Sequence, residues 1–254
     1  MDQIFTFLTP ISLTAALIIA FCAGFVKGVV GFAMPLVLIS GLTVFLSPEL
    51  ALAGLILPTL VTNIWQSLRQ GVGAALGSVV QFRVFLIAGF VTLVVAAQFV
   101  RSVPENALQL VIGIPVAFFA VLQLSGYQFR LHQKSLVVEA SVGGFAGVMG
   151  GLSGVWGPPT VSYLTALNTA KLDQMRIQGV IYGGGAIALF GAHLGSGVLR
   201  SETLVFSALM VPPAVMGMLI GMQVMDRFDQ TTFRKATLLV LLVAAFNLVR
   251  RGLF

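Results

Sequence analysis

Long apolar runs alternate with short polar segments along this chain. Six of the runs predict membrane-spanning helices, which need about 20 mostly apolar residues each. These runs cover residues 50–68, 82–100, 107–124, 177–194, 204–222 and 236–249. The polar segments that separate them, such as 69–83, 168–176 and 226–235, predict loops. The pattern therefore predicts an all-α integral membrane protein.

Two further apolar regions are interrupted by glycine-rich segments. In the first, the runs 11–25 and 33–46 flank a break at 27–31, and in the second, 136–149 and 158–167 flank a break at 150–157. A run of 15 residues covers about 22 Å as a helix, which is short of a hydrocarbon core of about 30 Å. Each region therefore predicts a broken or re-entrant helical hairpin.

The two broken stretches repeat one another at an offset of 123 residues. Four positions coincide at this offset, namely Gly24 with Gly147, Gly28 with Gly151, Gly31 with Gly154, and Pro35 with Pro158. Each stretch is followed by about three spans. We therefore predict two repeats in residues 1–125 and 135–254, which together form a single transport domain.

An alternative explanation of the glycines is close packing between membrane helices, for which Gly-xxx-Gly spacing is typical. Three observations favour a break instead. The glycines are dense, and each costs a helix about 1 kcal/mol relative to alanine. A proline follows at the same distance in both halves. The pattern also recurs at the same place in each half, which points to a transporter site at a repeat interface.

Composition supports a membrane protein and excludes several other classes. The chain is 58% hydrophobic and 9% charged, with a mean hydropathy of +1.03. Its net charge of +6 comes from basic residues scattered between apolar runs, which suit lipid headgroups rather than nucleic acid. The single cysteine, Cys22, excludes an internal disulfide or a cysteine metal cluster. Because Asp2 is not followed by early Lys or Arg, we interpret the first apolar run as structure rather than as a signal peptide.

The basic residues favour one membrane topology. If each broken stretch returns to its own side, nine basic residues share one side of the membrane and four share the other, whereas a single crossing gives seven against six. The first split is the asymmetry expected of a membrane protein, with both termini on the periplasmic side. Three spans per half then make the repeats inverted. Two full crossings per broken stretch give the same nine-to-four distribution. The charges therefore allow either ten spans or six spans with two hairpins.

The break in each half has the chemistry of an anion site. Pro35 and Pro158 suit the first turn of the helix that follows the break, where a missing N–H is harmless. The free N–H groups and partial positive charge of that helix then face the gap. Lys27 adds a full positive charge, and an ionisable residue inside a membrane is a functional candidate by default. The alternative is that Lys27 reaches lipid headgroups from a helix end.

These motifs resemble the two signatures of the TauE/SafE sulfite exporter family, also called TSUP. Residues 27–32 with Pro35-Leu36 resemble the first signature, and residues 143–147, 154–159 and 163–164 resemble the second, followed by the 171–176 loop. Ala33 stands where the family often has glycine. The resemblance implies a transporter in the inner membrane that carries sulfite, thiosulfate or organosulfonates. It implies neither an enzyme nor a cofactor.

We predict that both breaks line one substrate site near the membrane midplane. Polar residues on the spans after each break are further candidates, although interhelical hydrogen bonds explain them equally well. The predicted substrate-binding residues are Lys27, Gly28, Gly31, Asn63, Gln66, Ser153, Gly154, Trp156, Gly157, Gln178 and Tyr182. His193 and Glu139 are candidates for proton coupling, and no residue is predicted to bind a metal. The expected partners are a small anionic substrate and the lipid bilayer, and the sequence allows a homodimer.

Two rival functions are considered. Residues 151–154 read Gly-Leu-Ser-Gly, which matches the Gly-x-Ser-Gly of rhomboid intramembrane proteases, and His193 follows 40 residues after Ser153. A serine nucleophile needs a base within hydrogen-bond reach. The first repeat, however, has Val30 in place of Ser153. The second rival is a passive anion channel.

Overall fold

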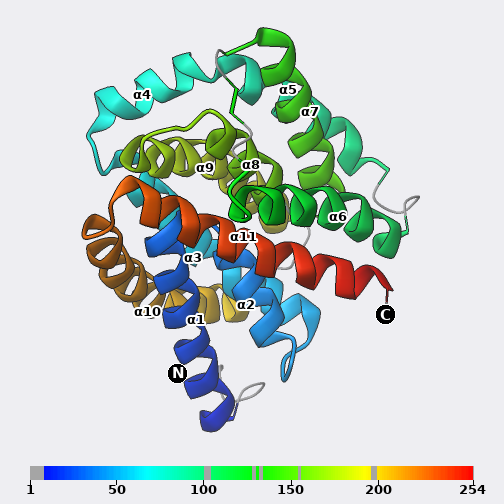
Figure 1. Cartoon of the computed structure of the whole chain (residues 1–254). Coiled ribbons are helices and arrows are strands. Elements are labelled where there is room, and N and C mark those ends of the chain that lie inside the picture. The colour runs from blue at the N-terminus through cyan, green and yellow to red at the C-terminus, as the bar shows by residue number, and fades with distance from the viewer. Residues whose placement is uncertain are drawn as a thin grey trace. The chain divides into compact units, whose positions relative to one another are not determined.

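The computed structural model describes residues 9–99, 104–127, 130–131, 134–153, 156–195 and 199–253. Within these residues the chain forms eleven α-helices and no β-strand, so the all-α prediction is confirmed (Figure 1). The helices are α1 (Pro10–Val30), α2 (Met34–Leu42), α3 (Pro48–Leu68), α4 (Val72–Gln81), α5 (Arg83–Ala97), α6 (Glu105–Leu124), α7 (Leu136–Ser153), α8 (Gly157–Ala166), α9 (Lys171–Gly195), α10 (Ser201–Asp226) and α11 (Gln230–Leu253).

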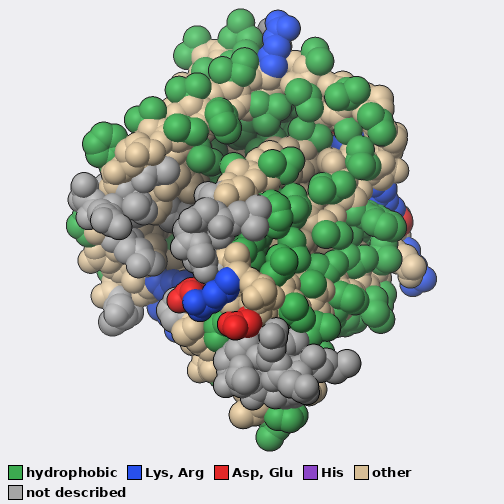
Figure 2. All heavy atoms as spheres, turned by 180° about the vertical axis from the view of Figure 1, so that it is seen from behind, with side chains coloured by type: hydrophobic (Ala, Val, Ile, Leu, Met, Phe, Trp, Pro, Cys, Tyr) green, Lys and Arg blue, Asp and Glu red, His purple; other side chains and the backbone are tan. Residues whose placement is uncertain are grey.

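Several of these helices have the length and composition of membrane spans. Among the described residues, four pass this test: α1, the Glu49–Leu68 part of α3, α10 and α11. Helices α4 and α5 meet at a bend of 73° and make a fifth span if the pair counts as one. Hydrophobic side chains cover much of the face shown in Figure 2, with few charged side chains among them. Exposed apolar residues such as Phe118 and Phe246, each 69% exposed, suit contact with lipid.

By its internal contacts the chain divides into two compact units. One unit joins Met1–Gly71 to Met175–Asp229, and the other joins Val72–Gln174 to Gln230–Phe254. Each unit therefore takes segments from both halves of the sequence. The predicted repeats, 1–125 and 135–254, are defined by sequence similarity rather than by contact, and their boundaries stay a prediction.

In the first unit, α1 lies along α10, and α10 also packs against α3 (Figure 1). The backbones of α1 and α10 touch at glycines. A Cβ atom added at Gly24 would lie 2.8 Å from the carbonyl carbon of Ala214, and one added at Gly217 would lie 2.9 Å from that of Phe21. Small residues permit this approach, as is common between membrane helices. Around the contact, a core of buried apolar residues joins α1, α2, α3 and α10.

The second unit contains an equivalent contact between α7 and α5. A Cβ atom at Gly147 would lie 2.8 Å from the carbonyl carbon of Gly89, and Thr92 Oγ1 donates a hydrogen bond of 2.8 Å to the carbonyl oxygen of Gly144. Helix α11 packs against α6 in the same unit. Gly24 and Gly147 are related by the 123-residue offset, so the same repeat position makes a close backbone contact between helices in each unit. This equivalence supports the predicted repeat, and the inverted orientation stays a prediction.

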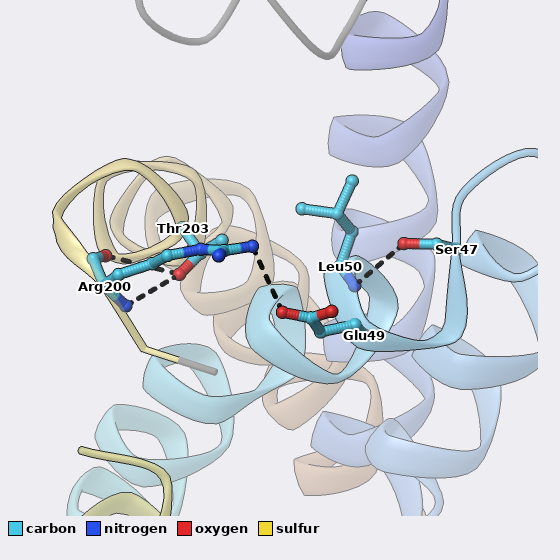
Figure 3. A network of polar contacts seen from close by, with 5 residues as sticks. All are labelled: Ser47, Glu49, Leu50, Arg200 and Thr203. Atoms are coloured by element: carbon cyan, nitrogen blue, oxygen red, sulfur yellow. Dashed lines mark hydrogen bonds and ion pairs between the residues drawn. The ribbon is translucent and has the colours of Figure 1, made fainter. Parts of the chain in front are cut away.

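Polar contacts fix where α3 and α10 begin in the first unit (Figure 3). Ser47 Oγ accepts a hydrogen bond of 3.4 Å from the backbone N–H of Leu50, and Thr203 Oγ1 accepts one of 3.0 Å from that of Arg200. Arg200 Nη2 lies 3.2 Å from Glu49 Oε1. Because both side chains of this ion pair are more than half exposed, its contribution to stability is small.

Five boundary predictions are wrong. Residues 150–153 of the predicted second break belong to α7, and residues 230–235 of the predicted loop 226–235 belong to α11. The other three are the first break and two further connections. Residues 27–30 belong to α1 rather than to a break, which shortens the first break to Gly31–Ala33. As a result α1 has 21 residues, while α2 has 9. The predicted polar connection 69–83 contains helix α4, and the predicted loop 168–176 already contains the first turns of α9. At the first break, packing of Gly28 against Met218 and Gly221 of α10 offsets the local cost of glycine in a helix.

Candidate anion-binding site

The break between α1 and α2 is a sharp change of backbone direction. Gly31 ends α1 with φ of 86°, and its N–H donates a hydrogen bond of 2.7 Å to the carbonyl oxygen of Lys27. Ala33 precedes α2 with φ of 70°, in the left-handed region that is unfavourable for a residue with a Cβ atom. Two left-handed residues so close together stop α1 and start α2 in a new direction.

Lys27 lies in the last turn of α1 and is 2% exposed. Its ammonium group donates a short hydrogen bond to Oδ1 of Asn63 on α3, and Asn63 is 1% exposed. In the described part of the chain, no Asp or Glu forms an ion pair with Lys27. Since a buried charge without a counter-charge is costly, the position of Lys27 favours binding of an anion over contact with lipid headgroups.

Two glutamine side chains hold the broken end of α1. Gln66 Nε2 donates hydrogen bonds to the carbonyl oxygens of Gly31, at 3.1 Å, and of Met175, at 2.7 Å. The amide of Gln178, on α9, faces the carbonyl oxygens of Gly31 and Val30, so its orientation is assigned with the nitrogen donating to them at 3.1 and 3.2 Å. The bonds to Val30 and Gly31 satisfy carbonyl groups that the end of α1 otherwise leaves unpaired. The same amide of Gln178 occupies the space that a side chain at position 31 would need.

The polar residues of α3 form a stripe that faces the interior of the first unit. Thr59, Thr62, Asn63 and Gln66 follow the i, i+3, i+4, i+7 spacing of one helix face, and each is at most 3% exposed. Thr62 Oγ1 donates to the carbonyl oxygen of Pro58 at 2.6 Å and lies 3.7 Å from Sδ of Met34, the first residue of α2. The stripe therefore connects Lys27 with the start of α2.

The start of α2 has no side-chain cap. Pro35 lies in its first turn, as predicted from the sequence. The first N–H groups of a helix have no partner within the helix itself. Such a helix start carries about half a positive charge. Together with Lys27, the first break thus offers positive charge and N–H groups without a carboxylate in the described surroundings.

The other predicted residues of this unit are Gly28 and Tyr182. Gly28 packs against α10. Tyr182 lies one turn after Gln178 on α9 and is 6% exposed. Sequence reasoning missed Thr59 and Thr62, although their helical spacing from Asn63 and Gln66 in an apolar run would have identified them.

The second break separates α7 from α8. Trp156 precedes α8, Gly157 begins it, and Pro158 lies in its first turn. A Cβ atom at Gly150 would lie 2.8 Å from the ring of Trp156, so the ring folds back onto α7. Gly154 and the side chain of Ser153 lie outside the described residues. The prediction that both breaks line one site is untested and stays a prediction.

The two candidates for proton coupling differ in what the structure describes. Glu139, at the start of α7, is 3% exposed. Its Oε1 accepts a hydrogen bond of 3.3 Å from the N–H of Phe85, near the start of α5, and its Oε2 lies 3.4 Å from Nζ of Lys134. These contacts account for its burial. The side chain of His193 lies outside the described residues.

In the described part of the chain, no group of three or more His, Cys, Asp or Glu residues forms a candidate metal site.

Comparison with known proteins identifies the class of protein to which the chain belongs. The family model described as Sulfite exporter TauE/SafE matches residues 16–248. The chain therefore belongs to the TauE/SafE sulfite exporter family, whose members are transporters and not enzymes. It is a multi-pass membrane transporter of anions, and the protease alternative is excluded. No curated protein and no solved structure gives a significant match to the chain.

Proposed function

We propose that this chain is a secondary transporter of a small sulfur-containing anion across the inner membrane, with sulfite, thiosulfate and sulfonates as the substrate class. The substrate binds at the first break, where Lys27 supplies the charge. The observation that carries the proposal is the burial of this ammonium group beside Asn63, with no carboxylate paired to it among the described residues.

The proposal follows from electrostatics in a medium of low dielectric constant. An unpaired ion taken out of water loses several kcal/mol of solvation even after relaxation. Asn63 Oδ1 offsets part of this loss for Lys27, and a bound anion offsets the rest. The N-terminus of α2 adds partial positive charge next to the same stripe of α3. A sulfur oxyanion is small and presents several oxygen acceptors, which suits these donors.

The test is uptake into proteoliposomes that contain the purified chain. We expect concentrative uptake of at least one of labelled sulfite, thiosulfate and a sulfonate, and Lys27→Gln is expected to lower uptake at least tenfold while leaving membrane insertion intact. Arg200→Gln is the matched control, because it also removes one cation but from an exposed ion pair. Uptake by Lys27→Gln at the wild-type rate contradicts the proposed site. Conductance without concentrative uptake supports the channel alternative instead.

A further inference from the structure

Two amide side chains in the candidate site have fixed orientations. Asn63 Oδ1 accepts the hydrogen bond from Lys27, so its Nδ2 points elsewhere. Gln66 Nε2 donates to two carbonyl oxygens, of Gly31 and Met175, so its Oε1 points elsewhere. Hydrogen-bond partners of this kind distinguish oxygen from nitrogen in an amide group. The identity of the remaining atom of each amide is therefore known.

Those remaining atoms are buried and unsatisfied. In the described structure, Asn63 Nδ2, Gln66 Oε1 and Thr59 Oγ1 have no hydrogen-bond partner. All three side chains lie within the polar stripe of α3 and are at least 97% buried, because none is more than 3% exposed. Buried polar groups without partners are rare in native proteins and call for a missing partner. Asn63 and Gln66 are one turn apart, so one small molecule spans the distance between them.

The two amide atoms require opposite partners. Asn63 Nδ2 is a donor and needs an acceptor oxygen, as does the ammonium group of Lys27. Gln66 Oε1 is an acceptor and needs an O–H or N–H group. An oxyanion without a hydrogen of its own satisfies the first requirement and leaves Gln66 Oε1 unpaired. A hydroxylated oxyanion satisfies both.

The charge of the site limits the charge of the ligand. Lys27 is the one cation that the described contacts place in this cluster, and no carboxylate is paired with it. A monoanion cancels its charge, whereas a dianion leaves a buried negative charge opposed only by the helix dipole of α2.

We propose that this site selects a singly charged oxyanion that carries its own hydroxyl group, as hydrogensulfite and hydroxyalkylsulfonates do, over dianions and over monoanions without a donor. Lys27 and Asn63 bind the oxyanion, and Gln66 Oε1 accepts the hydrogen bond from the hydroxyl. The inference rests on the proposed function, since it assumes that the anion binds beside Lys27.

The experiment compares two sulfonates of nearly the same shape on the full chain purified in detergent. Isethionate carries a terminal hydroxyl where 1-propanesulfonate carries a methyl group. Because a site built to bind a hydroxyl disfavours the analogue that lacks it, we expect isethionate to bind at least about tenfold more tightly by isothermal titration calorimetry. Sulfate, a dianion without a donor, is expected to bind more weakly than either.

Three variants locate the effect. Gln66→Leu is expected to reduce the preference for isethionate to about onefold to threefold. Asn63→Leu is expected to weaken both sulfonates together and to leave their ratio unchanged. Gln98→Leu removes an exposed amide from the residue that caps the C-terminus of α5 and serves as the matched control, with wild-type affinities expected. If Gln66→Leu fails to fold, the wild-type ratio alone still decides the proposal.

The outcomes separate this inference from the proposed function. Equal binding of the two sulfonates by the wild-type chain, or tighter binding of 1-propanesulfonate, overturns the inference, and so does an unchanged preference in Gln66→Leu. Uptake of sulfite that depends on Lys27, without binding of either sulfonate, overturns the inference and leaves the proposed function intact. The absence of any uptake dependent on Lys27 overturns both.

Discussion

Lys27 donates a hydrogen bond to Asn63 across 36 residues of sequence, and both side chains are almost completely buried. A neutral amide stands where a structural ion pair would have a carboxylate. The pair therefore keeps the positive charge of Lys27 available to a ligand. Replacing the Asn63 amide by a carboxylate is the smallest change that would neutralise Lys27 without a ligand.

Asn63→Asp is expected to bind anions poorly while folding normally. The new carboxylate forms an ion pair with Lys27 in nearly the same geometry and competes with the substrate for its charge. We expect the substrate KM to rise at least tenfold, with an apparent melting temperature equal to or above that of the wild type. Uptake kinetics and thermal unfolding in detergent measure the two quantities. Wild-type KM in this variant would mean that Lys27 does not contact the substrate.

Substitutions at the two left-handed residues of the first break, Gly31 and Ala33, are expected to change the stability of the protein in opposite directions. Gly31→Ala adds a Cβ atom at φ of 86° and in contact with the Gln178 amide, which should cost about 1–2 kcal/mol for the backbone alone. Ala33→Gly removes the strain at φ of 70° and should stabilise the protein by up to about 1 kcal/mol. Apparent melting temperatures of the purified variants test whether the first substitution destabilises the protein and the second stabilises it. A stable Gly31→Ala protein would contradict the described break.

The equivalent glycines of the two units are expected to be equally intolerant of substitution. In both Gly24→Val and Gly147→Val, the new side chain overlaps the backbone of the neighbouring helix. We expect either variant to lose most of its properly folded protein, as measured by fluorescence-detected size exclusion. Gly73→Ala is the control, because nothing lies within 4 Å of its added Cβ atom. It should gain up to about 1 kcal/mol from higher helix propensity.

Glu139 is expected to contribute to the folding stability of the protein. Glu139→Gln loses the ion pair with Lys134 and weakens the bond to the N–H of Phe85, which we expect to cost about 1–3 kcal/mol. If these contacts are its whole role, the pH dependence of uptake stays that of the wild type. A shifted pH profile in a variant that is still folded would support the proton-coupling hypothesis instead.

Membrane topology is tested by reporters on both sides of α11. The nine-to-four distribution of basic residues predicts that a reporter at Phe228 is cytoplasmic and that one after Arg251 is periplasmic. Phosphatase and fluorescent-protein fusions give opposite signals on the two sides. A cytoplasmic signal from the Arg251 fusion would exclude the predicted inverted arrangement.

Sequence patterns predicted most of the helices and singled out polar residues that the structure buries, such as Asn63 and Gln66, but not the extent of the first break. Local propensity placed a break at Lys27, because glycines weaken an isolated helix. The helix continues through Val30 since Gly28 lets it pack against α10, nearly 200 residues later in the chain. Helix α4 was missed for a related reason, because its glycines and flanking arginines outweighed the apolar residues between them. The convergence of Gln66 and Gln178 on the Gly31 carbonyl depends on tertiary contacts that no local pattern contains.

The pairing of α1 with α10 also has a consequence for how the protein is made. Roughly 170 residues separate the end of α1 from the start of α10, and a ribosome adds about 5–20 residues per second. Helix α1 therefore waits about 10–35 s for its partner, with Gly24 and Gly28 not yet packed against α10 in the meantime. During that interval the nascent chain depends on lipid or on the insertion machinery to cover the glycine face of α1. A stop codon before α10 should thus give a product that is degraded rather than a stable half-protein.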